Sequence, residues 1–108
     1  MLNELARSIN NTAVKKGWWE TERNFGELIA LMHSELSEAL EDWRNGSGFN
    51  VICSTKSAKP EGIPTELADC IIRILDACAH YHIDIDKAVR IKMLYNKTRS
   101  YRHGGKIA

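Results

Sequence analysis

The 108-residue sequence has only two prolines, three cysteines and no apolar run that approaches the roughly 20 residues of a membrane-spanning helix. The cysteines form no CxxC pair, which argues against a disulfide framework and a zinc knuckle. Cys70 and Cys78 would stand about 12 Å apart along one helix, too far apart for a disulfide. The first residues lack a basic segment followed by an apolar stretch, so we expect no signal peptide. These absences favour a cytoplasmic protein with reduced thiols.

The composition indicates a small folded domain with little charge imbalance. Hydrophobic residues make up 44% of the chain, and the net charge of +1 points to neither nucleic acid nor a membrane as the partner. We expect one domain over residues 1–108. Because a chain this short buries only about 60–70% of its unfolded surface, its core is thin. A homodimer or homotetramer would bury a further face.

Four segments carry apolar residues at three- or four-residue spacing, which predicts helices. They span about residues 2–15, 25–43, 64–80 and 85–101. Asn24 and Glu27 have the spacing of a capping box at the start of the second segment, and Asp84 is expected to cap the fourth. The loop at 46–62 contains a piece, 49–53, that fits either a helical turn or a strand-like segment. The sequence therefore predicts an all-α, four-helix bundle-like domain.

The last predicted helix is expected to place an apolar face inward. Helical spacing predicts that this face is formed by Ala88, Ile91, Leu94 and Tyr95. A glycine pair, 104–105, is expected to end the fold.

Two pairs of acidic residues stand at helical spacing. Glu35 and Glu38 are three residues apart in the second segment, and Glu66 and Asp69 are three apart in the third. Residues three apart share a helix face, so two neighbouring helices can direct four carboxylates at one point. Such a cluster needs cations to offset its repulsion, and oxygen ligands favour Mg²⁺ or Mn²⁺.

Two alternatives compete with this metal site. The acids can be ordinary solvated side chains, since the second segment has other acids. A di-iron carboxylate bundle would need Glu-x-x-His from two helices, and the sequence contains no such motif.

The end of the chain is strongly basic. No acidic residue occurs from Lys87 onward, and Lys92, Asn96 and Arg99 fall on one helical stripe. A cationic stripe beside a metal site suits a polyphosphate. The stripe can also reflect the preference of basic residues for helix C-termini, or it can be a surface that binds nucleic acid.

The acidic motifs and the chain's end together resemble a known family. Glu35-Leu-Ser-Glu38, 27 residues, then Glu66-Leu-Ala-Asp69 resembles the paired ExxE…ExxD signature of the MazG-like nucleoside triphosphate pyrophosphohydrolases. The segments 92–99 and 102–106 resemble that family's last helix and tail, and Trp19 resembles an aromatic that some members place against the base. One departure is Ser34, where many members have a further Glu.

The resemblance implies an all-α enzyme that hydrolyses nucleoside triphosphates between the α and β phosphates. It would assemble as a dimer or tetramer. Mg²⁺, with Mn²⁺ as a possible substitute, would be held by Glu35, Glu38, Glu66 and Asp69, and either Glu35 or Glu38 would be the general base. The proposed substrate ligands are Lys92, Asn96, Arg99 and Lys106 for the phosphates, and Trp19 and Asn10 for the base and sugar.

Two kinds of alternative function stay open. The first is a relative with a narrower substrate, such as a dUTP, dCTP or phosphoribosyl-ATP pyrophosphohydrolase. The second is a non-enzymatic helical interaction or nucleic-acid-binding module.

Overall fold

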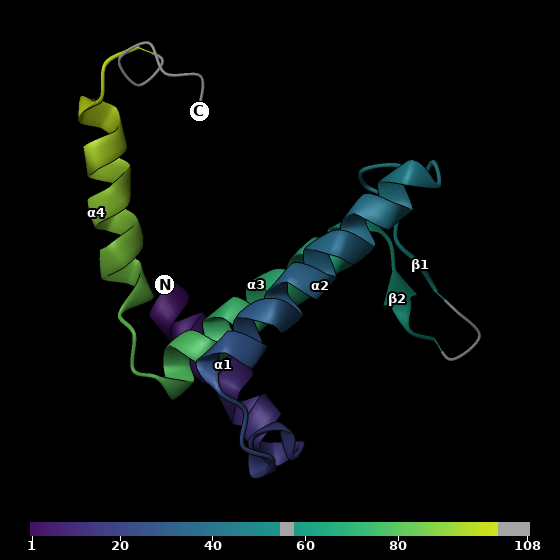
Figure 1. The fold of residues 1–108 in the computed structure, drawn as a ribbon, viewed down its shortest axis with the longest axis horizontal. Helices are drawn as coiled ribbons and strands as arrows, with labels where there is room; N and C mark the ends of the chain where they lie inside the picture. The colour runs from purple at the N-terminus through teal and green to yellow at the C-terminus, as the bar shows by residue number, and fades with distance from the viewer. Residues whose placement is uncertain (55–57, 102–108) are drawn as a thin grey trace.

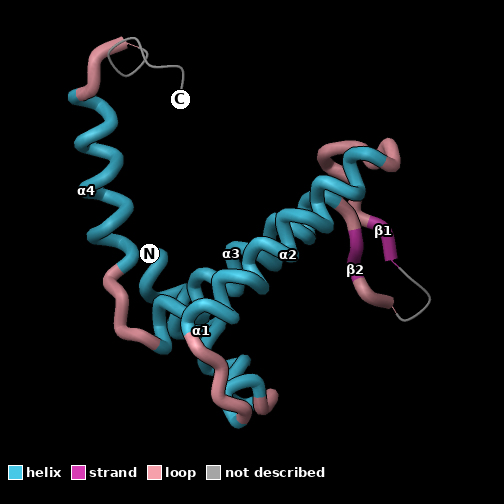
Figure 2. Tube along the Cα trace, viewed as in Figure 1, coloured by secondary structure: helices cyan, strands magenta, loops and turns pink. Residues whose placement is uncertain are grey.

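The computed structural model describes residues 1–54 and 58–101. Four α-helices dominate this part of the chain, with a short 3₁₀ helix and two very short strands between them (Figures 1 and 2). The elements are α1 (Leu2–Lys15), η1 (Trp18–Glu20), α2 (Phe25–Arg44), β1 (Cys53–Ser54), β2 (Pro60–Glu61), α3 (Ile63–His80) and α4 (Ile85–Thr98). The predicted helical class is therefore confirmed.

The predicted helix starts hold because local side chains satisfy free backbone N–H groups. Asn24 accepts a hydrogen bond from the backbone N–H of Glu27, and its amide also donates to the Glu27 carboxylate. Asp84 accepts from the backbone N–H of Lys87 in the same way at the start of α4. Both predicted caps are therefore confirmed.

Helix α3 is the centre of the packed part of the molecule. It packs against α2 along one side and against α1 along another. Figure 1 shows α2 and α3 running side by side, with α1 crossing them at one end. Small and branched apolar side chains form the buried core: Ala6, Leu28, Ala39, Ile63, Cys70, Leu75, Ala77 and Cys78. Cys70 and Cys78 are free and buried, in agreement with the prediction of unpaired thiols.

The start of α4 is tied to the start of α1. The carboxylate of Asp86 accepts hydrogen bonds from the terminal amino group of Met1 and from the backbone N–H groups of Leu2 and Asn3. The Asn3 side chain accepts in return from the backbone N–H of Ile85. These donors hold the pKa of Asp86 at about 2, so the junction stays charged at all ordinary pH values.

The rest of α4 extends away from the other helices. It leaves the packed part near the N-terminus, and no residue of α4 is buried (Figure 1). The expectation that Ala88, Ile91, Leu94 and Tyr95 face inward is wrong for a single copy, because all four are exposed and the last three are more than half exposed. The radius of gyration is 16.7 Å, against about 13 Å for a compact domain of this length. Within one copy the packed unit is thus made by α1, α2 and α3.

The predicted loop between α2 and α3 contains a small antiparallel pairing. Cys53 pairs with Glu61 and Ser54 with Pro60. The strand-like interpretation of segment 49–53 is therefore partly confirmed, at its last residue. Among the described residues, no helix combines the length and apolarity that crossing a membrane requires.

Candidate metal centre and pocket

Three of the four predicted carboxylates meet between α2 and α3. One oxygen from each of Glu35, Glu38 and Glu66 lies within 4.8 Å of the others. Glu35 and Glu66 are buried, whereas Glu38 is exposed. Asp69, the fourth, is not part of this close group but lines the adjoining pocket. Its charge still contributes to raising the pKa of Glu66, so it belongs to the same acidic surroundings.

Glu66 has the most perturbed carboxyl group of the site. A hydrogen bond with Glu38 raises its pKa most, followed by burial and by the charges of Glu38, Asp69 and Asp42, and together they bring it to about 7. Within the described residues its Oε2 is buried without a hydrogen-bond partner. A buried acceptor without a donor is costly, and a divalent cation would relieve that cost. The donor set therefore fits Mg²⁺ or Mn²⁺, which prefer carboxylate oxygens.

Arg73 supplies the counter-charge for Glu35. Its Nε lies 2.9 Å from Glu35 Oε1, and this ion pair spans from α3 to α2. The guanidinium also lies 5.2 Å from the centre of the Trp18 ring, and Arg23 lies over the same ring at 3.8 Å. Arg73 thus connects the acidic group with the aromatic residues of η1.

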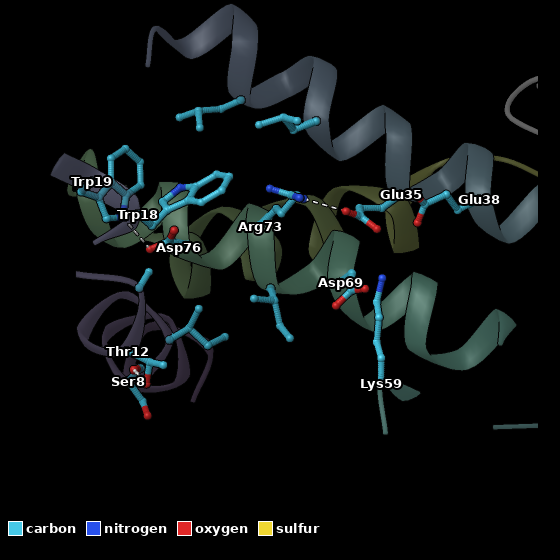
Figure 3. A pocket seen from close by; sticks show the side chains of 15 residues that line it. Ser8, Thr12, Trp18, Trp19, Glu35, Glu38, Lys59, Asp69, Arg73 and Asp76 are labelled. Carbon is cyan, nitrogen blue, oxygen red and sulfur yellow. Dashed lines mark hydrogen bonds and ion pairs between the residues drawn. The ribbon is translucent and has the colours of Figure 1, made fainter. Parts of the chain in front are cut away.

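A pocket of about 690 Å³ adjoins the acidic group and is formed by α1, η1, α2, α3 and the segment before β2. Its size is in the range of ligand sites in proteins. In Figure 3, Glu35, Glu38 and Asp69 lie toward one end, Trp18, Trp19 and Asp76 toward the other, and Arg73 between them. Lys59 also lines the pocket. The pocket therefore has a charged end and an aromatic end.

The aromatic end is organised around one carboxylate. Asp76 Oδ1 accepts hydrogen bonds from Asn10 Nδ2 at 2.8 Å and from Trp19 Nε1 at 3.1 Å. The Trp19 ring stacks on His80, with centroids 3.7 Å apart and planes 5° apart. Asn10 and Trp19, predicted as binding residues, are thus held together at one place.

Sequence reasoning missed Arg73 and Asp76. A signal existed, since Asp69, Arg73 and Asp76 stand at i, i+4 and i+7 of one helix and so share a face. These two residues sit in a mostly apolar stretch, whose periodicity indicates a core-facing helix rather than a pocket.

The basic residues of α4 do not join this pocket in a single copy. Lys92, Asn96 and Arg99 lie on the extended helix or at its end, and none of them lines the pocket. Lys92 and Arg99 instead lie near the Tyr95 ring, at 5.2 and 5.7 Å from its centre. Lys106 lies outside the described residues.

The chain matches no family model, and neither a curated protein nor a solved structure is significantly similar to it. The pocket itself and the sequence motifs are therefore what indicate a function for this chain.

Proposed function

We propose that this chain is a Mg²⁺-dependent nucleoside triphosphate pyrophosphohydrolase of the MazG-like kind, which releases a nucleoside monophosphate and pyrophosphate. The observation that carries the proposal is that one pocket joins a group of three carboxylates, including the unpartnered Glu66 oxygen, to an aromatic end. The buried free thiols Cys70 and Cys78 suit a cytoplasmic location.

Each end of the pocket suits a different part of a nucleotide. The metal ion would be held by Glu35, Glu38, Glu66 and Asp69. It would neutralise phosphate charge and activate the attacking water. Glu38 is the exposed member of the close group, so it is the acid best placed to take a proton from that water. The base then points toward Trp18 and Trp19, where aromatic surface is available.

A second copy of the chain fits the remaining features. Apolar side chains of α2 and α3 stay exposed: Leu36, Leu40, Trp43, Leu67, Ile71 and Ile74. We propose that a homodimer or homotetramer covers them. Because Lys92, Asn96 and Arg99 do not reach the pocket of their own copy, they would bind phosphates in the site of a neighbouring copy.

The test is pyrophosphate release from ribo- and deoxynucleoside triphosphates, with Mg²⁺ and with EDTA. We expect release only with the metal. Glu38→Gln should lower kcat at least 100-fold while the helical circular dichroism signal is kept. Glu41→Gln is the matched control, because Glu41 is an exposed acid of α2 outside the close group. Equal activity of Glu38→Gln and the wild type would show that Glu38 takes no part in the reaction.

The extended helix favours one alternative function. No residue of α4 is buried, and the helix carries Arg90, Lys92 and Lys97, which suits a nucleic-acid-binding module. Such a module predicts binding to DNA or RNA that weakens steeply with salt, and no metal-dependent turnover.

A further inference from the structure

The aromatic end of the pocket holds a carboxylate that phosphate chemistry does not need. Asp76 is only 7% exposed and lines the pocket. Its two hydrogen-bond donors, from Asn10 and Trp19, are both neutral. In the described part of the chain no cation pairs with Asp76, since Arg73, one turn away, pairs with Glu35. A buried carboxylate with so few partners retains strong acceptor capacity.

The two donors determine which oxygen of Asp76 remains for a ligand. An indole N–H can only donate and a carboxylate can only accept, so Trp19 and the amide nitrogen of Asn10 together occupy both lone pairs of Oδ1. Stacking on His80 holds the Trp19 ring in place. No donor of the described residues contacts the other oxygen, Oδ2. This oxygen is therefore the acceptor that the aromatic end offers.

The ligand group that fits is a flat ring with an N–H donor on its edge. Trp18 and Trp19 offer apolar surface to the ring, and Asp76 accepts from the donor. Cytosine, adenine and guanine each have an exocyclic amino group that donates. At the position where cytosine has its amino group, uracil and thymine have a carbonyl oxygen, and a carbonyl oxygen facing a carboxylate is repelled.

We propose that Asp76 reads the base and selects nucleotides with an exocyclic amino group over those with a carbonyl group in its place. The inference rests on the proposed function, because phosphates held at the acidic end leave the base at the aromatic end. Asn10 is then a positioning residue, which orients the Asp76 carboxylate.

The test compares nucleotides that differ in this group and in the neighbouring ring nitrogen, which accepts in the amino member and carries a hydrogen in the carbonyl member. CTP and UTP differ at position 4 of the base, and ATP and ITP differ at position 6. For the wild type we expect kcat/KM to favour the amino member at least tenfold in each pair that is turned over, since a site built for a hydrogen bond rejects an analogue that lacks it. Equal values, or a preference for the carbonyl member, would overturn the inference.

Asp76→Asn gives the sharper version of this test. The amide oxygen of the new side chain must accept from Asn10 and Trp19, so its NH₂ group takes the place of Oδ2. This replaces an acceptor with a donor, and we expect the preference to shift toward the carbonyl member by tenfold or more. Ser8→Ala, which also alters the pocket lining, should keep the wild-type preference. An unchanged preference in Asp76→Asn would overturn the inference.

A second readout separates failure of the inference from failure of the proposed function. Quenching of tryptophan fluorescence by CMP and UMP needs no hydrolysis. Turnover without a base preference overturns the inference and leaves the pyrophosphohydrolase in place. No turnover, with CMP bound at least tenfold more tightly than UMP, overturns the enzyme proposal and supports the role of Asp76. If there is no turnover and CMP does not bind more tightly than UMP, both the inference and the enzyme proposal are overturned.

Discussion

The carboxyl group of Glu66 combines three properties that ordinary surface acids lack. It is buried, one of its oxygens has no partner among the described residues, and its pKa is raised to about 7. Its neighbours Glu38 and Asp69 add negative charge rather than offsetting it. Without a cation this group is therefore a source of instability once it ionises.

In the absence of metal, the stability of the protein should depend on pH through Glu66. The pKa of Glu66 rises from 4.5 to about 7 on folding, so its favourable contribution is complete below pH 4.5 and is lost as the pH rises to about 7. We expect the free energy of unfolding to fall by roughly 1–3 kcal/mol over this range. Thermal unfolding in EDTA from pH 4.5 to 8 measures it.

Glu66→Gln is the control for this prediction, because it removes the ionisable group at the same position. Its stability should change less with pH than that of the wild type. Mg²⁺ or Mn²⁺ at pH 8 should raise the Tm of the wild type and have little effect on Glu66→Gln. Identical pH profiles for the two proteins would contradict the assigned pKa.

For single residues, the sequence indicates which carboxylates share a helix face, but it indicates few of the other residues that line the pocket. Glu35 with Glu38 and Glu66 with Asp69 are recognisable because residues three apart on a helix must share a face. The role of Asp76 is not recognisable in this way, because it depends on Asn10, 66 residues away in the chain. Only the packing of α1 on α3 brings these two residues together.

Among the elements, the start of α3 depends on one glycine. Gly62 has φ 134°, which favours glycine, and it precedes the helix that carries Glu66. A Cβ at this position would collide with the backbone carbonyl oxygen of Val51. The close approach holds the residue before α3 against the segment that precedes β1, and so positions the first turn of α3.

We expect Gly62→Ala to destabilise the protein by roughly 2–4 kcal/mol and to weaken Mn²⁺ binding, because the backbone must shift to relieve the collision. Urea unfolding and titration calorimetry measure the two effects. Gly46→Ala is the matched control, since Gly46 also has positive φ but has open space around it. If Gly62→Ala cost no more stability than Gly46→Ala, the close approach would not matter.

A smaller effect is expected at the start of α2. Asn24→Ala removes the acceptor for the Glu27 backbone N–H and should lower the free energy of unfolding by about 1 kcal/mol. Activity per folded molecule should stay unchanged, because the close carboxylates lie beyond the first turns of α2. A loss of activity without a loss of stability would mean that this cap also shapes the site.

The helices themselves are predictable from the sequence, and their packing only in part. Caps and periodicity are local, so Asn24 and Asp84 indicate where α2 and α4 begin. The position of α4 relative to the other helices does not follow from the local sequence. Its apolar residues Ile91 and Leu94 have the spacing of a buried face yet remain exposed in one copy. An amphipathic pattern indicates that a face becomes covered but not which chain covers it.

For the whole molecule, the extended shape and the exposed apolar side chains predict association. We expect the wild type to sediment as a dimer or tetramer. Ile71→Glu, at a half-exposed apolar position of α3, should shift it toward monomer and reduce pyrophosphate release at least tenfold. Val14→Glu is a control on α1, also about half exposed, outside the α2 and α3 side chains proposed for the contact. A monomeric wild type with full activity would contradict the proposed assembly.

The proposed function depends above all on hydrolysis between the α and β phosphates at a metal-dependent site, which ³¹P NMR of the reaction can follow. With Mg²⁺, the resonances of a nucleoside triphosphate should be replaced by those of a monophosphate and pyrophosphate in equal amounts, and EDTA should stop the change. A nucleoside diphosphate with orthophosphate, or an unchanged spectrum for every nucleotide tested, would contradict the proposed reaction.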